Sequence, residues 1–164
     1  MRVMFIGHKA VSSLAFSPNG RFLVSASASV RKWNIRDGSS KVLPVTRPPR
    51  SFTSVAFSPD GRYVAAGNYD RSLWIWDSRT HRLVAKWLGH ARSVSCIEFT
   101  PDGKGLLSGG LDKTIKYWDV SLLGNRQGVS TGPIVNEEQG FPLVRNFLGH
   151  KVCVVVLLLS RKVD

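Results

Sequence analysis

A repeat with a period of about 42 residues is the feature that most constrains how this chain folds. Three similar segments, FSPNG at 16–20, FSPDG at 57–61 and FTPDG at 99–103, are separated by 41 and 42 residues. Three tryptophans recur at intervals of 43 and 42 residues: Trp33, Trp76 and Trp118. Catalytic residues seldom recur at even intervals, whereas stacked structural units do. The repeat therefore indicates an array of small units that bury their apolar faces against one another.

Each period predicts four short β-strands separated by turns. The runs rich in β-branched and aromatic residues in the third period are 93–99, 105–109 and 113–120, and the run 82–88 provides the fourth strand of the second period. Leu73 and Ile75 are expected on one side of their strand. Trp74 and Trp76 are then on the other side, so this strand is apolar on both faces. A sheet stacked between two other sheets requires that pattern, and no amphipathic run reaches three helical turns.

The composition is that of a single globular domain. The chain has 164 residues, of which 43% are hydrophobic and 21% are charged. Its longest unbroken apolar run, 152–159, is too short for a membrane-spanning helix, which needs about 20 residues. The two cysteines, Cys96 and Cys153, suit a reducing compartment and leave a single disulfide bridge open as an alternative.

The chain is strongly basic. Its 23 Lys and Arg residues against 11 Asp and Glu residues give a net charge of +12. Such a charge favours acidic partners by long-range attraction, either nucleic acid or acidic protein segments. The basic residues fall at similar places in successive periods, with no dense run and no aromatic stacking platform. We therefore expect acidic segments of other proteins as partners, without direct nucleic acid binding, a membrane or a small-molecule substrate.

A Gly-His pair accompanies these features at 7–8, 89–90 and 149–150. Together with the Ser/Thr-Pro-Asp/Asn-Gly turn, the Asp that follows and the Trp-Asp that ends a strand, it resembles the WD-repeat family over residues 2–151. The resemblance implies an all-β fold, an incomplete WD-repeat β-propeller in an open arc. We expect about three complete four-stranded blades with a stray strand at each end.

The periods divide the chain, one partial propeller over 1–164, into four parts. These are repeat 1 at 7–46, repeat 2 at 47–87, repeat 3 at 88–147 and the start of a broken fourth repeat at 148–164. The interval from Trp118 to the next Gly-His is 18 residues longer than the interval after Trp76. Repeat 3 therefore contains a loop insertion at about 121–141, which we expect to be mobile. The fourth repeat loses its turn, Asp and Trp, which favours a truncation or an altered terminus.

The resemblance also implies a hydrogen-bonded set of four side chains in a complete repeat. The third repeat has all four, namely His90, Ser108, Asp112 and Trp118. The first repeat has three of them, namely His8, Ser25 and Trp33. The second has Asp70 and Trp76, with Pro48-Pro49 and Ala66 in the other places. These sets are expected to stabilise the blades, because a buried polar network is costly when half-paired.

Ser108, His90 and Asp112 could instead be the parts of a nucleophilic triad. A hydrolase needs one exposed nucleophile with an oxyanion hole, whereas this set belongs to a periodic structural element. The sequence contains no metal-ligand cluster, no plausible pair of catalytic carboxylates and no nucleotide-binding fingerprint. We expect no enzymatic activity, no cofactor and no metal site.

A narrower resemblance rests on the order in which the repeats depart from the pattern. A repeat without Gly-His precedes one with a long insertion, and this order is similar to the C-terminal propeller of fungal Tup/Groucho-like transcriptional corepressors over 51–151. It implies a scaffold that binds DNA-bound regulators in the nucleus, with the cytoplasm as the alternative location. The alternative functions are a WD module of another class, either a ubiquitin-ligase substrate receptor or a signalling scaffold, and a non-functional truncated paralogue.

The resemblance places partner binding on the loops before the first strand of each blade and between its second and third strands. Six residues at those positions are the expected contacts: Lys9, Arg50, Tyr69, Arg92, Leu111 and Lys151. Tyr69 and Arg92 are preferred, because Tyr and Arg are common anchors of protein interfaces.

Overall fold

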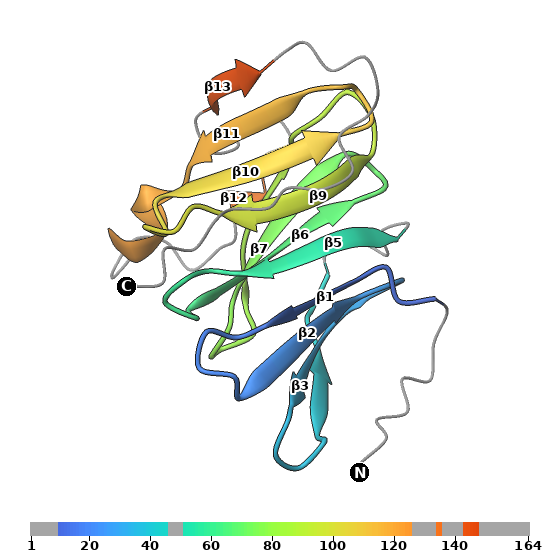
Figure 1. The fold of residues 1–164 in the computed structure, drawn as a ribbon, viewed down its shortest axis with the longest axis vertical. Helices are drawn as coiled ribbons and strands as arrows, with labels where there is room; N and C mark the ends of the chain where they lie inside the picture. Colours follow the sequence, from blue (N-terminus) through green and yellow to red (C-terminus); the bar gives the residue numbers. More distant parts are fainter. Residues whose placement is uncertain (1–9, 46–50, 126–133, 136–142, 148–164) are drawn as a thin grey trace.

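The computed structural model describes residues 10–45, 51–125, 134–135 and 143–147. They form three sheets that stack face to face in an open arc (Figure 1). Blade 1 contains β1 (Ser13–Phe16), β2 (Phe22–Ala26), β3 (Val30–Asn34) and β4 (Ser40–Val42). Blade 2 contains β5 (Phe52–Phe57), β6 (Tyr63–Asn68), β7 (Ser72–Asp77) and β8 (Leu83–Leu88). Blade 3 contains β9 (Val94–Phe99), β10 (Gly105–Gly110), β11 (Ile115–Asp119) and β13 (Leu143–Phe147).

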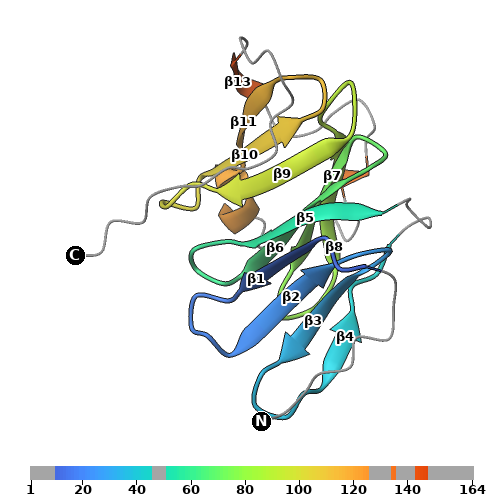
Figure 2. The ribbon, with the colours of Figure 1, turned by 45° about the vertical axis from the view of Figure 1, so that its right-hand side comes forward.

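The first strands of successive blades are neighbours. β1 lies beside β5, and β5 lies beside β9, as the second ribbon view also shows (Figure 2). The predicted all-β architecture, with three four-stranded blades in an open arc, is confirmed. The stray strands expected at the two ends fall within 1–9 and 148–164, outside the described residues.

The Ser/Thr-Pro-Asp/Asn-Gly segment closes the hairpin between the first two strands of each blade. In blade 2, the Asp60 carboxylate accepts a hydrogen bond from the Ser58 hydroxyl (2.6 Å). Gly61 has a φ of 72°, in the left-handed region that favours glycine, and its N–H donates to the Ser58 carbonyl. Glycines with positive φ occupy the same place in the other two blades, at Gly20 and Gly103. The repeated segment therefore sets the same tight turn three times.

Two apolar cores join the blades, one at each junction. β7 contributes to both, because its side chains alternate between the two faces of its sheet. Leu73 and Ile75 are buried in the core between blades 2 and 3. Trp74 and Trp76 are buried in the core between blades 1 and 2. The middle blade is thus covered on both faces, as the sequence predicted.

Parts of the expected loop insertion have regular structure. Ser121–Asn125 form a 3-10 helix, and Leu123 within it is buried in the core between blades 2 and 3. The Leu123 carbonyl accepts a hydrogen bond from the Tyr63 hydroxyl of blade 2 (2.7 Å). β12 (Ile134–Val135) pairs in parallel with β8 as a fifth strand of the middle sheet. In the part of 121–141 that the structure describes, a buried leucine and a strand pairing hold these residues against blade 2.

Candidate protein-interaction site

Four polar side chains of the third repeat form one chain of hydrogen bonds. The Trp118 indole N–H donates to Ser108 Oγ (2.9 Å). Ser108 Oγ lies 2.8 Å from His90 Nε2, and His90 Nδ1 lies 2.9 Å from a carboxylate oxygen of Asp112. His90 precedes β9, Asp112 lies in the β10–β11 turn, and the other two residues come from β10 and β11. These are the four residues that the resemblance placed in a complete set.

The partners of the His90 imidazole set the direction of donation. An indole N–H can only donate, so the Ser108 oxygen accepts a hydrogen bond from Trp118. The Ser108 O–H in turn donates a hydrogen bond to His90 Nε2. His90 then carries its proton on Nδ1 and donates it to Asp112. Burial lowers the pKa of His90 from 6.5, against the raising effect of Asp112, so the imidazole is neutral at pH 7.

Asp112 accepts several hydrogen bonds at once. Its carboxylate accepts from the Thr114 hydroxyl (2.7 Å), from the Ala91 N–H (2.8 Å) and from His90. Burial alone would raise the pKa of Asp112, but these hydrogen bonds lower it from 3.8 to about 2. The carboxylate is therefore ionised at every pH well above 2, which includes the whole range in which the neutral His90 donates to it.

We expect the free energy of unfolding to fall as the pH is lowered from about 7 to about 5. Because the pKa of His90 is lowered in the folded chain, the unfolded chain binds a proton below pH 6.5 that the folded chain excludes. The pKa of His81 is also lowered, by burial and by Lys32 and Lys41, and this acts in the same direction. A second decline, from about pH 4 to about pH 2, is expected as Asp112 is protonated.

Urea unfolding at a series of pH values checks this expectation. The His90→Gln variant should lose part of the decline between about pH 7 and about pH 5, and the His81→Gln variant should lose another part. A stability that is constant over that range in the unmodified chain would contradict it.

The burial of Ser108 bears on the alternative of a nucleophilic triad. Ser108 is 0% exposed, and its hydroxyl is already engaged by Trp118 and His90. A nucleophile must reach a substrate carbonyl, with donors in place for the oxyanion. The geometry is therefore that of a structural network and does not suit acyl transfer.

In blade 2, Asp70 and Trp76 belong to separate hydrogen-bonded sets. The Trp76 indole donates to the Pro44 carbonyl (2.7 Å), across the junction with blade 1. Asp70 accepts from Ser72, both from its N–H (3.0 Å) and from its hydroxyl. The Trp74 indole donates to the Ser72 hydroxyl (2.6 Å). Blade 2 thus has a chain of hydrogen bonds from Trp74 through Ser72 to Asp70, while Trp76 bonds across the junction with blade 1.

A buried asparagine marks the place where blade 2 lacks its His. Asn68 ends β6 as Gly110 ends β10, and Asn68 is fully buried, with its Oδ1 accepting from the Asp70 N–H (2.9 Å). A Cβ at Gly110 would overlap the ring of His90 and the carboxylate of Asp112. Glycine is thus required where the His is present, and blade 2, which has none, accommodates a larger side chain.

Blade 1 keeps one bond of the set. The Trp33 indole donates to Ser25 Oγ (2.9 Å), and both side chains are buried. The turn of this blade has no Asp to extend the chain of hydrogen bonds. His8, the third residue expected here, lies outside the described residues.

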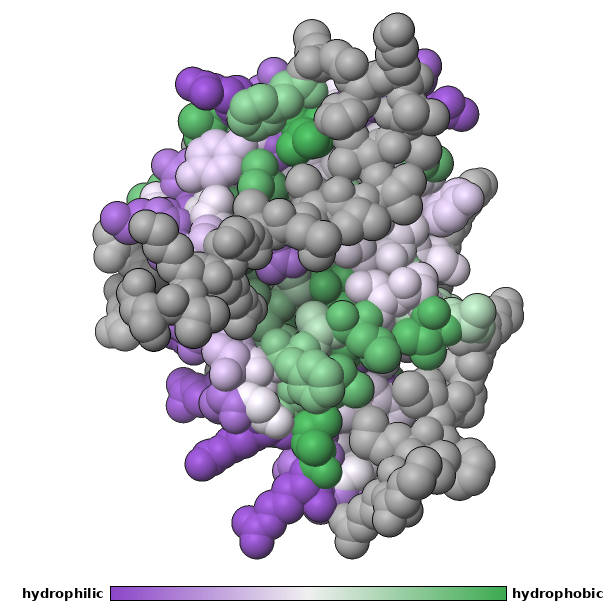
Figure 3. Space-filling view, viewed as in Figure 1, coloured by the Kyte–Doolittle hydropathy of each residue, from purple (hydrophilic) through white to green (hydrophobic). Residues whose placement is uncertain are grey.

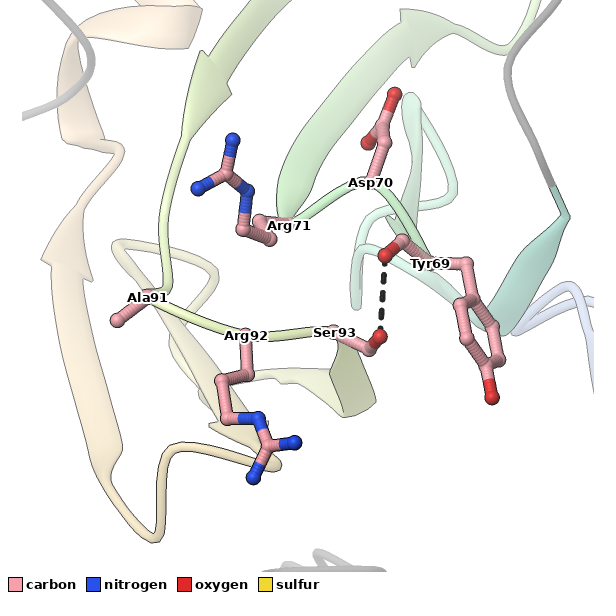
Figure 4. A pocket seen from close by; sticks show the side chains of 6 residues that line it. All are labelled: Tyr69, Asp70, Arg71, Ala91, Arg92 and Ser93. Carbon is pink, nitrogen blue, oxygen red and sulfur yellow. Dashed lines mark hydrogen bonds between the residues drawn. The ribbon is translucent and has the colours of Figure 1, made fainter.

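A pocket of about 470 Å³ lies where the β6–β7 loop meets the segment before β9 (Figure 4). We call it the blade 2–3 pocket, and its lining residues are Tyr69, Asp70, Arg71, Ala91, Arg92 and Ser93. Tyr69 and Arg92 extend to the same side of the two segments in Figure 4, and Arg71 and Asp70 extend to the other side. Tyr69 is 53% exposed, so its ring is available to a partner.

Hydrogen bonds hold the two segments of the pocket together. The Ser93 hydroxyl donates to the Tyr69 carbonyl (3.0 Å), and the Gly89 N–H donates to the Arg71 carbonyl (3.0 Å). The Ala91 N–H donates to Asp112, so the buried set of blade 3 also fixes the segment that carries Arg92. The interior network is therefore the support of one wall of the pocket.

The structure brings together two of the six expected contact residues, Tyr69 and Arg92. Leu111 is adjacent, since its N–H donates to the Ser93 carbonyl (2.9 Å). The other three lie outside the described residues: Lys9, Arg50 and Lys151.

Sequence reasoning missed Arg71, which lines the pocket from the β6–β7 turn. Arg71 has a φ of 78°, and Lys113, at the equivalent position in blade 3, has a φ of 68°. Positive φ is uncommon outside glycine and marks a tight turn here. The available signal was a basic residue directly after the turn Asp in both repeats, Asp70-Arg71 and Asp112-Lys113.

Comparison with known proteins identifies the repeat. The family model described as "WD domain, G-beta repeat" (WD40) matches residues 2–39, 45–77 and 81–119. The chain belongs to the WD40 repeat family. WD40 repeat domains generally act as noncatalytic scaffolds that bind other proteins.

Solved structures similar to this WD40 chain include those titled "Structure of U3-55K" and "Crystal structure of RRP9 WD40 repeats". Each is 23% identical to it in sequence, with a TM-score of 0.76. The match covers 93% of this chain but 43% and 42% of the other two, so the chain spans less than half of their length. No curated protein shows a significant sequence match. These comparisons do not support the narrower resemblance to Tup/Groucho-like corepressors.

The described residues hold neither a membrane-spanning helix nor a cluster of metal-binding side chains. None of their helices is both long and apolar enough to cross a membrane. Within the same ranges, no three His, Cys, Asp or Glu side chains are grouped so that they could hold a metal ion.

Proposed function

We propose that this WD40 chain is a noncatalytic scaffold whose blade 2–3 pocket binds an acidic segment of a partner protein. The observation that carries the proposal is that the exposed Tyr69 and Arg92 extend to the same side of one pocket, which Arg71 also lines. An Arg guanidinium offers a planar fork to a carboxylate, and a Tyr ring offers apolar contact with a polar tip. Tyr and Arg are also the residue types that most often anchor protein interfaces.

The charges of the pocket suit an acidic ligand. Its cations are Arg71 and Arg92, and its anion is Asp70. The Asp70 carboxylate accepts from the N–H and the hydroxyl of Ser72, so it is used inside its own turn. The net charge of +12 adds long-range attraction for an acidic chain. A carboxylate of the partner would pair with Arg92, and a neighbouring apolar side chain would lie on Tyr69.

The combined substitution Tyr69→Ala with Arg92→Glu is expected to weaken binding of an acidic peptide by about tenfold or more. It removes the exposed ring and replaces a cation that attracts the peptide with an anion that repels it. Fluorescence anisotropy of a short labelled Glu/Asp-rich peptide, titrated with the purified chain at several salt concentrations, measures the change.

Arg79→Glu is the matched control. It changes the charge by the same amount. Arg71 of the pocket precedes β7 and Arg79 follows it, so Arg79 lies at the end of that strand that is away from the pocket. The control should retain most of the binding at moderate salt, where distant charges are screened. Equal losses in the two variants, or undiminished binding by the double variant, would remove the pocket from the proposal.

Within this scaffold role, the narrower proposal is a corepressor that binds DNA-bound transcription regulators in the nucleus, without contacting nucleic acid directly. Its support is the order of the repeats, a second blade without its His followed by a third blade with an insertion. Tethering the chain beside a reporter gene tests it. Repression that needs Tyr69 and Arg92 supports the corepressor role. Unchanged reporter output, with peptide binding retained, favours a WD40 module of another class, a ubiquitin-ligase substrate receptor or a signalling scaffold.

A further inference from the structure

Blade 1 exposes a set of apolar residues that the other two blades bury. Phe16 ends β1 as Phe57 ends β5 and Phe99 ends β9. Phe16 is 64% exposed, whereas Phe57 is 4% and Phe99 is 3% exposed. The buried pair lie in the cores that join each blade to the blade before it. We call this side of a blade its upstream face.

Other positions of the upstream face repeat the contrast. Leu14 of blade 1 is 56% exposed, whereas the equivalent Val55 and Ile97 are buried. Val11 is also exposed, and its equivalents Phe52 and Val94 are fully buried. Figure 3 shows hydrophobic side chains gathered over the region of β1 on the surface of the molecule. Contiguous apolar surface of this kind usually marks a site of interaction.

Blade 3 has a matching surface on its opposite, downstream face. Leu107 and Tyr117 are register partners on that face, and Ile115 lies beside them. All three are half-buried. Their equivalents on the downstream face of blade 2 are fully buried against blade 3: Ala65, Leu73 and Ile75.

An aromatic ring stands at the same place on each downstream face. Blades 1 and 2 supply it from the start of the second strand, as Phe22 and Tyr63. Blade 3 has Gly105 there, and a Cβ at Gly105 would overlap the Tyr117 ring, so this ring covers the position from the neighbouring strand. The downstream face of blade 3 thus has the form of the two downstream faces that pack against a blade.

We propose that two copies of this chain associate head to tail, with the upstream face of blade 1 in one copy against the downstream face of blade 3 in the other. Inside the chain, a downstream face meets an upstream face at both blade junctions, and the proposed contact repeats that pairing. The three blades that the structure describes, taken from two copies, supply six blades, within the range of about four to eight found in closed propellers. A heterologous contact of this kind closes into a ring when its rotation permits.

The contact between copies is expected to be weaker than the junctions inside the chain. Glu98 stands on the downstream face of blade 3 where the other blades have Ala15 and Ala56. Burying a carboxylate costs free energy that an alanine does not. The association should therefore depend on concentration.

Sedimentation velocity of the full 164-residue chain over a range of concentrations tests the proposal. We expect a shift from monomer to dimer, and Phe16→Lys should raise the dissociation constant by about thirtyfold or more. The exposed position of Phe16 lets the variant fold, which urea unfolding can verify. Leu88→Lys is the matched control, because Leu88 is an exposed residue at the end of β8 on the middle blade, away from both end faces.

Mixing two variants separates a head-to-tail contact from other kinds of association. Phe16→Lys spoils only the upstream face, and Leu107→Glu spoils only the downstream face, so neither variant should associate by itself. An equimolar mixture retains one intact face of each kind and should form a one-to-one complex.

Three results would overturn the proposal. They are a chain that stays monomeric at every concentration, association that Phe16→Lys leaves unchanged, and failure of the mixture to associate when the variants are folded. If the chain is monomeric, blades from another polypeptide segment, and not a second copy, are the partners that the two faces fit.

Discussion

Replacing Asp112 with alanine is expected to lower the free energy of unfolding by about 3 kcal/mol. The carboxylate accepts from His90, from the Thr114 hydroxyl and from the Ala91 N–H, and the variant leaves these donors without their acceptor. His90 is the buried one of these donors, and a buried donor without a partner costs about 1–3 kcal/mol, more than the net gain of an ordinary hydrogen bond. Urea unfolding followed by tryptophan fluorescence measures the loss.

Asp70→Ala is the matched control for this prediction. Asp70 occupies the equivalent turn of blade 2, but within the described structure its carboxylate accepts from Ser72 only. We expect this variant to lose about 1 kcal/mol. If both variants lose the same amount, the set in blade 3 is not the main source of the stability of its turn, and the prediction fails.

Replacing Trp74 with alanine is expected to lower the free energy of unfolding by about 4 kcal/mol. Trp74 is 0% exposed and stacks on Trp76, with ring centroids 5.7 Å apart and an interplanar angle of 15°. Phe52 meets Trp74 edge to face at 5.7 Å. The substitution leaves a large cavity in the core between blades 1 and 2, and a cavity costs more than the lost transfer free energy alone. Denaturant unfolding measures the loss.

Trp74→Phe separates packing from the hydrogen bond to Ser72. It keeps an aromatic ring on Trp76 and removes the indole donor, so we expect a loss of about 1–2 kcal/mol. A loss as large as that of Trp74→Ala would show that the hydrogen bond, and not the stacked ring, holds this junction.

The architecture and the set in blade 3 could be predicted because their signals are local. The turn segments, the strand-ending tryptophans and the Gly-His pairs recur with one period, and each determines structure within its own repeat. His90, Ser108, Asp112 and Trp118 could be named together because the resemblance to WD repeats assigns each of them to a fixed place in that repeat.

The arrangement in blade 2 could not be predicted, because it depends on the neighbouring blade. Trp76 has the same place in its repeat as Trp118, yet its indole donates to the Pro44 carbonyl, 32 residues away across a blade junction. Trp74 and Ser72 then form their own chain of hydrogen bonds with Asp70. No pattern within one repeat specifies which partner an indole reaches in the next blade.

The sequence by itself determined the units of this protein, and the tertiary structure decided their surroundings. Phe16 and Phe57 end equivalent strands before nearly identical turns, yet only Phe57 is buried, because among the described blades only its face has a blade against it. In the same way, Tyr69 and Arg92 belong to different repeats and line one pocket because blades 2 and 3 stack. A short motif sets backbone geometry through its own turns and hydrogen bonds, whereas burial depends on which surfaces come together after the chain has folded.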